Sequence, residues 1–294
     1  MKINQKINKA PKEILKKVKT TKNKKVLKSP VTYYWGKLRM ASRIVKLIPK
    51  HTLYCEPYCW WCSVFFKKPP SEIEVLNDIN SHVVNFFRVM QQDFGMLKII
   101  INCTPYSRQQ VHTARHILKY HEYYDDIKRA RAFWVACNMS FSAMITGGYK
   151  YTKHTNKSVK AFNNKKEQFD THLLERLTNV DFECNDAIKV IKSRDHEDAF
   201  FYIDPPYIWE QKVHQWHYAG FTPEDYIVLL DTLSNIKGKF LLSNYPSTIL
   251  SSYANRNGWY IIEIAWKQTA PNSSVTGKRK NKTELLVANY PITL

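Results

Sequence analysis

Short apolar runs alternate with amphipathic helical patterns along most of the chain. Runs typical of buried strands occur at 53–56, 73–76, 180–184, 199–203, 239–243, 260–265 and 285–288. Apolar residues recur every three or four positions, as in helices with one buried face, at 38–47, 83–90, 109–121, 125–137, 169–178, 223–235 and 247–256. Strands that alternate with helices predict an α/β fold with a mostly parallel sheet, and the last two runs predict an antiparallel hairpin at its edge.

The long helical patterns separate two segments that contain strands. We therefore expect one domain built from residues 30–90 and 180–294, a helical insert at 91–179 and a basic, flexible tail at 1–29. Within the insert, the polar stretch Lys150–Lys166 interrupts the helical pattern and predicts an irregular segment.

The most distinctive local pattern is Asp204-Pro205-Pro206-Tyr207, directly after an apolar run. Two prolines fix φ and withhold two backbone donors, so the strand ends there. The proline carbonyls remain free to accept hydrogen bonds, beside one carboxylate and one aromatic ring. Such a turn suits a planar group that carries an amine, for example an adenine or a cytosine. From these residues alone, an ordinary turn with a solvated aspartate remains the alternative.

Composition narrows the class of protein. The net charge is +20, and the chain stays basic without its lysine-rich tail, which favours a polyanionic partner such as nucleic acid. No apolar run approaches the roughly 18 residues of a membrane span, and the N-terminus lacks the apolar segment of a secretory signal. Six cysteines in 294 residues are too few for a disulfide scaffold and predict a reducing, cytoplasmic environment.

Six motifs in order relate the chain to a known family. They are Tyr33-Tyr34-Trp35-Gly36-Lys37, the loop Cys55–Phe65 with Glu56-Pro57-Tyr58, Asn77-Asp78-Ile79-Asn80, Asn138-Met139-Ser140-Phe141-Ser142, Asp204-Pro205-Pro206-Tyr207, and Lys282-Thr283-Glu284 with Asn289-Tyr290. With them, the chain resembles the S-adenosylmethionine-dependent adenine-N6 DNA methyltransferases of the Dam type. The resemblance implies a Rossmann-like methyltransferase domain at 30–90 and 180–294, and a target-recognition role for the insert 91–179.

For the reaction, the resemblance implies direct methyl transfer from S-adenosylmethionine to an adenine flipped out of double-stranded DNA. The carboxylate of Asp204 and the carbonyl of Pro205 would accept hydrogen bonds from the N6 amino group, and Tyr207 would stack on the base. The implied catalytic residues are Asp204, Pro205, Pro206 and Tyr207. The implied cofactor-binding residues are Tyr33, Lys37, Glu56, Pro57, Tyr58, Asp78 at the ribose, Asp186 at the cofactor adenine, and Asp204. No metal ion is needed, and we expect a monomer.

Two basic stretches are candidates for DNA binding. Lys150, Lys153 and Lys157 alternate with Tyr149, Tyr151 and Phe162, a pattern that suits contact with phosphates and stacking on bases. A solvated loop is an equally good interpretation of these residues alone. The second stretch, Lys278, Arg279 and Lys280, lies between the strands of the last hairpin, near the predicted site.

The departures from the family pattern are systematic. Trp35, Trp60, Trp61, Trp209 and Trp216 stand where relatives are expected to carry glycine, and the chain has eight glycines where about twenty are typical. Glycine serves such loops because it adopts positive φ and lets the backbone approach a ligand. Trp60 and Trp61 therefore predict a clash with the cofactor. One explanation is a degenerate homologue that only binds DNA. The other is a gene whose UGA codons mean glycine but were read as tryptophan.

The same loop leaves a second chemistry open. Cys55, Cys59 and Cys62 have the spacing C-x3-C-x2-C, which resembles the radical S-adenosylmethionine signature with three thiolates on a [4Fe–4S] cluster. The Glu-Pro-aromatic context of the loop favours the methyltransferase instead. A third possibility is a basic protein that binds DNA without catalysis.

Overall fold

The computed structural model describes residues 27–31, 37, 40–141, 145, 147–209, 212–213, 220–267 and 281–293. The expectations for residues 1–26, Tyr33, Trp35, Trp216, Lys278, Arg279 and Lys280, and for the side chain of Trp209, lie outside this part of the chain.

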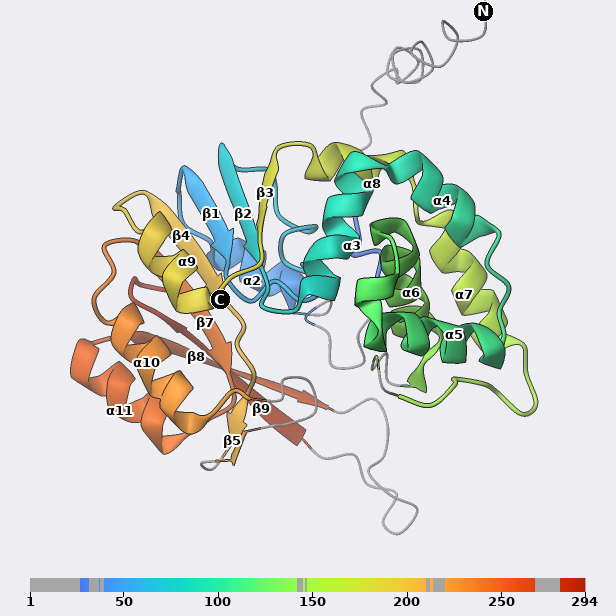
Figure 1. The fold of residues 1–294 in the computed structure, drawn as a ribbon. Coiled ribbons are helices and arrows are strands. Elements are labelled where there is room, and N and C mark those ends of the chain that lie inside the picture. Colours follow the sequence, from blue (N-terminus) through green and yellow to red (C-terminus); the bar gives the residue numbers. More distant parts are fainter. Residues whose placement is uncertain are drawn as a thin grey trace, which may run out of the picture.

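A seven-stranded sheet forms the centre of the fold, in the order β3-β2-β1-β4-β7-β9-β8 (Figure 1). Its strands are β1 (Leu53–Glu56), β2 (Ile73–Asn77), β3 (Val180–Glu183), β4 (Ala199–Ile203), β7 (Lys239–Asn244), β8 (Tyr260–Lys267) and β9 (Asn281–Ala288). The first five in spatial order are parallel neighbours, whereas β9 is antiparallel to both β7 and β8. The predicted sheet is confirmed, with β9 inserted between β7 and β8. A short hairpin of β5 (Ile208–Trp209) and β6 (Lys212–Val213) follows β4.

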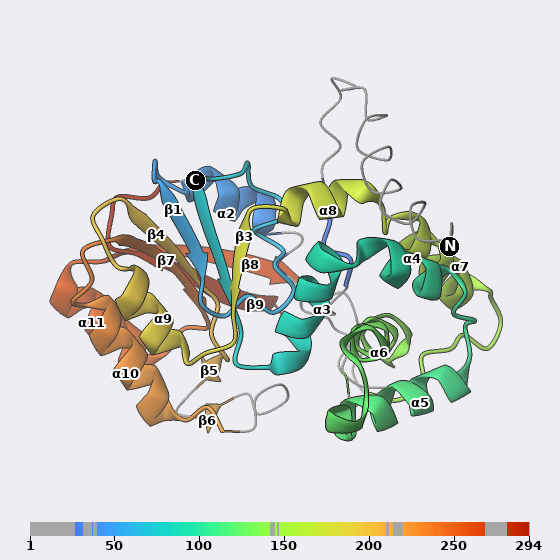
Figure 2. The same cartoon turned by 45° about the horizontal axis from the view of Figure 1, so that its top comes forward.

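Helices cover both faces of the sheet. One face carries α2 (Ala41–Leu47) and α3 (Ser81–Gln92), and the other carries α9 (Ala187–Arg194), α10 (Pro223–Leu233) and α11 (Thr248–Asn257) (Figures 1 and 2). The alternation of β4 explains the two layers, because Phe200 and Tyr202 join one apolar cluster while Phe201 and Ile203 join the other. The sequence pattern did not predict α9, which is only eight residues long.

The helices between β2 and β3 lie beside the sheet. They continue from α3 as α4 (Phe94–Asn102), α5 (Arg108–Lys119), the 3₁₀ helix η1 (His121–Tyr123), α6 (Asp126–Met139), α7 (Lys157–Glu167) and α8 (Thr171–Leu177). Figure 2 shows α6 end-on, with α3, α4, α5 and α7 around it. This position explains why α6 is almost entirely buried. The sequence pattern did not predict α4.

The prediction of an irregular segment at Lys150–Lys166 is wrong for its second half. Helix α7 starts at Lys157, and Phe162 on it is 2% exposed. The Phe162 ring packs against that of Trp134, 5.1 Å between centroids, so it is a core residue and not a stacking surface for DNA bases. The sequence pattern did not predict α7, because most of its residues are polar and only one narrow face of the helix is buried.

One apolar cluster runs from the sheet into the insert. It includes Tyr54 and Leu76 of the sheet, Phe86 of α3 and Trp134 of α6. The chain already packs at 27–31, since Ser29 is 2% exposed and the Trp134 indole donates a hydrogen bond to the Pro30 carbonyl, 3.2 Å. The boundaries 1–29 and 91–179 stay a prediction. Within the described residues, no helix has the length and apolar character that a membrane span requires.

The strand order reverses between β1 and β4, which are neighbours in the sheet. In open α/β sheets, ligands bind at the carboxyl ends of the strands beside such a reversal. Asp78 follows β2 and Asp204 follows β4 at this edge. The fold therefore places the two carboxylates predicted for the site on one edge of the sheet.

Candidate active site

The Asp-Pro-Pro-Tyr turn leaves the carboxyl end of β4, which is buried along its whole length. The Lys37 ammonium lies 3.4 Å from an Asp204 carboxylate oxygen, and it lies over the Tyr207 ring, 4.7 Å from its centroid. Burial raises the pKa of Asp204 and lowers the pKa of Lys37, and their mutual attraction opposes both shifts. Three residues predicted for the site thus meet in the structure.

A buried carboxylate from β9 completes this group. Oε1 of Glu284 accepts hydrogen bonds from the hydroxyls of Tyr207, 2.6 Å, and Ser243, 2.5 Å, and it also accepts from the Lys37 ammonium. The ammonium further donates to both hydroxyls. Glu284 is 4% exposed, and burial raises its pKa to about 8. The cluster therefore holds two carboxylates, Asp204 and Glu284, around the Lys37 ammonium, and the Tyr207 hydroxyl contacts both Glu284 and this ammonium.

Strand pairing brings Ser243 and Glu284 together. In the antiparallel pair of β7 and β9, Ser243 stands opposite Leu286, so Glu284 is its diagonal neighbour on the same face. The sequence showed Glu284 only as part of a motif, and it did not single out Ser243. No local pattern identifies this pair, because its two members are far apart in the chain.

The loop 57–64 lies against the carboxyl end of β2. The Asn77 side-chain amide donates to the Pro57 carbonyl, 2.9 Å, and the Cys59 amide donates to the Asn77 carbonyl, 2.8 Å. The Asp78 carboxylate accepts from the backbone amides of Trp60, 3.0 Å, and Asn80, 2.8 Å. Asp78 is 1% exposed. The predicted ribose-binding carboxylate is thus held rigidly by the loop and by the start of α3.

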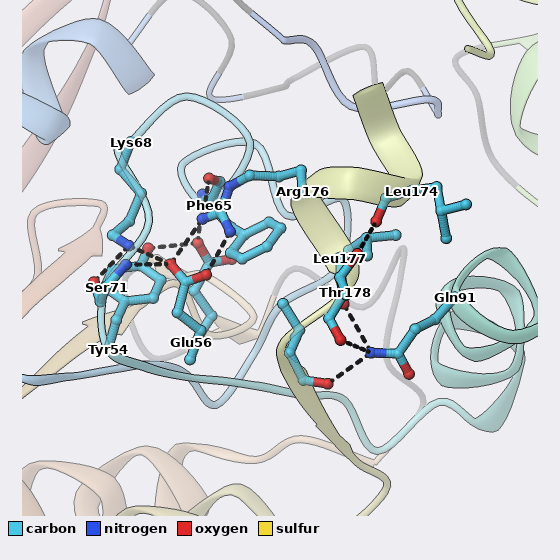
Figure 3. A network of polar contacts seen from close by, with 12 residues as sticks. Tyr54, Glu56, Phe65, Lys68, Ser71, Gln91, Leu174, Arg176, Leu177 and Thr178 are labelled. Atoms are coloured by element: carbon cyan, nitrogen blue, oxygen red, sulfur yellow. Dashed lines mark hydrogen bonds and ion pairs between the residues drawn. The ribbon is translucent and has the colours of Figure 1, made fainter. Parts of the chain in front are cut away.

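Glu56 faces the interior of the same loop. Its carboxylate accepts hydrogen bonds from the Tyr54 hydroxyl, 2.5 Å, and from the Phe65 amide, 2.8 Å (Figure 3). Burial raises the pKa of Glu56 to about 8. The contact joins the residue before the loop to a residue just after it, so Glu56 closes the loop on itself.

Tyr58, at the start of the loop, lies near Asp186 at the start of α9. The Tyr58 ring meets that of Phe221 edge to face, 6.3 Å between centroids. Asp186 is the N-cap of α9 and accepts from the Lys189 amide, 3.1 Å. Burial, followed by the charge of Asp186, raises the pKa of Tyr58. Phe221 was not predicted, and it extends the aromatic surface beside Asp186.

Backbone torsions identify which loop positions favour glycine. Among the described non-glycine residues, only Trp60, φ 42°, and Cys62, φ 49°, have positive φ. Trp61 has no such torsion, so positive φ does not explain a glycine there, and its assignment to a glycine position stays a prediction. Its ring is buried and stacked on Phe133, 5.8 Å between centroids, as in an ordinary core residue. Trp60 has the backbone conformation that favours glycine, as expected, and Cys62 is the second strained position.

We expect the double variant Trp60→Gly/Cys62→Gly to bind S-adenosylmethionine more tightly than the parent. A left-handed conformation costs a non-glycine residue roughly 1–2 kcal/mol, and removal of the indole frees the loop backbone. Titration calorimetry measures the gain. Trp61→Gly is the matched control, and it should lower the unfolding temperature through the lost packing on Phe133. Equal affinity of the double variant and the parent would contradict an obstruction of the cofactor by the Trp60 indole. In the gene, a UGG codon at position 60 would exclude recoding there.

The three cysteines of the iron–sulfur alternative do not converge. Cys55 packs in the apolar cluster on one face of the sheet, whereas Cys59 and Cys62 belong to the cluster on the other face. No three His, Cys, Asp or Glu side chains form a metal-binding group in the part of the chain that the structure describes. The structure therefore does not support this alternative.

The candidate DNA-binding lysines of the insert, Lys150, Lys153 and Lys157, are all exposed. Near them, the Arg108 guanidinium lies 5.0 Å from the Tyr149 ring centroid and 5.8 Å from that of Tyr151. Tyr151 is 58% exposed. Arg108 was not predicted, because only the fold brings the start of α5 to this segment. It adds a planar cation to the basic, aromatic surface.

The sheet is doubly wound and includes an antiparallel β9. An Asp-Pro-Pro-Tyr turn lies beside the strand reversal, and an acid lies at the end of β2. Together, this fold and site are typical of a Rossmann-like S-adenosylmethionine-dependent methyltransferase. The family model of the D12 class N6 adenine-specific DNA methyltransferases matches residues 33–270. The chain belongs to this family. It is thus an adenine-specific DNA methyltransferase whose cofactor is S-adenosylmethionine.

The chain is also similar to individual proteins. The chain is 25% identical to the Type II methyltransferase M1.LlaDCHI of Lactococcus lactis subsp. cremoris, over 92% of this chain and 98% of the relative. It is also 25% identical to the DNA N-6-adenine-methyltransferase of Escherichia phage P1, over 58% of this chain but 23% of that protein. Among solved structures, the precorrin-6y C5,15-methyltransferase of Geobacter metallireducens aligns over 85% of both chains with a TM-score of 0.34 and 7% identity.

Proposed function

We propose that the protein flips the target adenine out of double-stranded DNA and methylates its N6 atom directly, with the base held at Asp204–Tyr207. The observation that carries this proposal is the buried cluster at the end of β4, where Asp204 and Tyr207 meet Lys37 and Glu284. A carboxylate beside an aromatic ring can accept a hydrogen bond from an exocyclic amine while the ring stacks on the base. When bound, S-adenosylmethionine supplies the activated methyl group.

The chain's own residues have three tasks at the target base. The Asp204 carboxylate and the Pro205 carbonyl accept from the amino group, which localises the nitrogen lone pair. Pro206 fixes the turn and Tyr207 stacks on the base. Transfer of the methyl group to N6, with the C–S bonding electrons left on sulfur, would require this nitrogen to release one proton, and the Asp204 carboxylate would be the group placed to take it. Burial raises the pKa of Asp204, which favours acceptance of that proton at Oδ1 or Oδ2.

The residues present fit the cofactor. Asp78 offers a buried carboxylate to ribose hydroxyls, and Tyr58 with Phe221 offers aromatic surface near Asp186. The carboxylates of Asp204 and Glu284 suit a sulfonium cation at the methionine end, where Lys37 can pair with its carboxylate. Pro57 lies in the loop that borders this space. Glu56 acts by holding the loop, since its carboxylate is turned toward Tyr54 and Phe65.

We infer that the insert binds the DNA duplex through Lys150, Lys153, Lys157, Arg108 and Tyr151. Lysines neutralise phosphates, and tyrosine stacks on a base or sugar. The loop with Lys278, Arg279 and Lys280 remains a candidate for the same role. We further propose that the protein is a monomer, acts on cytoplasmic DNA and belongs to a restriction–modification system. Its similarity to a Type II methyltransferase over nearly its full length supports the last point.

The test of the proposed function is transfer of a labelled methyl group from S-adenosylmethionine to unmethylated genomic DNA. Label should appear as N6-methyladenine in digested DNA. Binding of DNA without any transfer, in the parent and in Trp60→Gly/Cys62→Gly alike, would overturn the proposal and favour a homologue that only binds DNA.

Replacement of Lys150, Lys153 and Lys157 by glutamine is expected to weaken DNA binding at every sequence. Each lysine that neutralises a phosphate adds about 0.9 to the slope of log affinity against log salt concentration, so the slope should fall by about two to three. Fluorescence anisotropy from low to moderate salt measures it. A control with Lys189, Lys192 and Lys237 changed to glutamine removes the same charge outside the insert. An equal loss of slope in both variants would contradict a specific role of the insert.

A further inference from the structure

Arg176, on α8 of the insert, reaches the cofactor loop. Its guanidinium donates to both carboxylate oxygens of Glu74 on β2 and to the carbonyl of Phe65, 3.1 Å (Figure 3). It also stacks on the Phe65 ring, with 3.5 Å from the guanidinium carbon to the ring centroid. The side chain of Arg176 is 6% exposed. One buried arginine thus holds the backbone and the ring of the same residue.

Phe65 is where the loop ends. Its amide donates to Glu56, the last residue before the loop, and its carbonyl accepts from Arg176. Both polar groups of the Phe65 backbone are therefore held by buried side chains. Residues 57–64 form a closed loop whose base is fixed by these two contacts, while Asn77 and Asp78 hold its middle.

The charges around Glu74 are arranged so that Arg176 is held in one orientation. The Lys68 ammonium donates to Oε1 of Glu74, 2.5 Å, and to the Ser71 hydroxyl, 2.7 Å. It also lies over the Tyr54 ring, 4.2 Å from the centroid. The planar guanidinium of Arg176 pairs with both carboxylate oxygens of Glu74, one of which also accepts from Lys68. In this bidentate geometry, a further N–H of the guanidinium is directed at the Phe65 carbonyl.

Helix α8 is itself anchored at its C-terminal end. The Gln91 amide, on α3, donates to the carbonyls of Leu177, 2.7 Å, and Val180, 3.0 Å (Figure 3). These contacts satisfy helix-end carbonyls and tie α8 to α3, which begins next to Asp78. Contacts with α3 and with Glu74 on β2 therefore anchor α8 and Arg176 independently of the loop that Arg176 holds.

We propose that Arg176 is a positioning residue for methyl-donor binding, because it fixes the closing end of the loop 57–64 through Phe65 and so builds the insert into the cofactor site. This inference rests on the proposed function, in which that loop borders the cofactor. A buried ion pair by itself is weak support for a stabilising role. The bond to the Phe65 carbonyl adds a specific geometric role, since a loop displaced by about 1 Å can cost a bound ligand much of its correct alignment.

The test compares Arg176→Lys and Arg176→Gln with the parent. Lysine retains the charge but cannot reach both Glu74 oxygens and the Phe65 carbonyl together. We expect the Kd for S-adenosylmethionine, measured by calorimetry without DNA, to rise about tenfold in both variants. The Kd for genomic DNA fragments should stay within about twofold, because the exposed DNA-binding lysines are untouched. Arg194→Gln, which breaks a partly exposed pair with Asp181 and Glu183, is the control and should change neither constant.

A purely structural role would lower both affinities in parallel with the unfolding temperature, and that result would overturn the inference. Unchanged cofactor affinity would overturn it as well. Should the arginine variants fail to fold, Phe65→Leu keeps the carbonyl contact and removes only the stacked ring. It should raise the cofactor Kd about twofold, and no change would count against the inference. Because cofactor binding is measured without methylation, a parent that binds S-adenosylmethionine but leaves DNA unmethylated would refute the proposed function alone.

Discussion

Asp204→Ala is expected to abolish methyl transfer and to leave DNA binding intact. Asp204 follows a fully buried strand, and its carboxylate is in place before any ligand arrives because Lys37 holds it. Alanine removes the acceptor that localises the lone pair of the target amine and takes its proton. Loss of one preorganised polar group of this kind costs about 10²–10³-fold in kcat, and loss of proton transfer adds to it. We expect at least about 10³-fold.

Single-turnover transfer of labelled methyl groups measures this effect, and anisotropy measures DNA binding in parallel. Asp204→Asn retains one acceptor oxygen and should lose less activity than Asp204→Ala. Asp181→Ala, an exposed aspartate paired with Arg194, is the control and should behave like the parent. Activity of Asp204→Ala within about tenfold of the parent would show that the carboxylate does not carry the chemistry.

Glu284→Ala is expected to lower methyl transfer by about 10²-fold, although Glu284 does not touch the target base in the proposed arrangement. Its Oε1 is the shared acceptor for Tyr207, Ser243 and Lys37. Alanine leaves a buried ammonium and two buried hydroxyls without that acceptor, and a buried donor left without its partner costs about 1–3 kcal/mol, more for a charged one. The Tyr207 ring then loses the orientation that stacking requires.

Two readouts separate positioning from simple loss of stability. Glu284→Gln keeps an acceptor for the Tyr207 hydroxyl, so it should retain more activity than alanine at equal unfolding temperature.

Burial raises the pKa of Glu284 from 4.5 to about 8. The folded state thus favours the protonated acid, and this contribution to stability is present below about pH 4.5 and lost as pH rises to about 8. The glutamine variant should show a shallower decline of unfolding free energy over this range. Identical pH profiles would contradict a buried, titrating Glu284.

Local sequence patterns predicted the helices and strands well where an element has one clear apolar face or is buried on both of its faces. The run at Ala199–Ile203 became β4 with the same bounds. The helical pattern at 223–235 became α10, where Thr222 forms a capping box with Asp225. Helix α7 was missed because its apolar face is narrow, so that lysines dominate the sequence while Phe162 decides the packing.

The loop shows a different limit of sequence reasoning. An unusual residue in a glycine-rich motif is visible in the sequence, but which positions require positive φ is a property of the backbone. Positive φ angles occur at Trp60 and Cys62, whereas the Trp61 ring packs on Phe133 in the core. No sequence pattern indicated a role for Arg176, because an arginine in an amphipathic helix is typical of a solvated face.

The sequence by itself determined the class of protein through six motifs in order, and the resemblance they carry names Asp78 and Asp204 for the site. Both residues follow strands, and the strand ends of a parallel sheet meet at one edge whatever the details of packing. Only the tertiary structure decided which distant groups support them. The pairing of β7 with β9 brings Glu284 to Tyr207, and the docking of α8 brings Arg176 to Phe65. Such contacts join residues 77 and 111 positions apart. They depend on burial and on strand register across the sheet, which local composition does not encode.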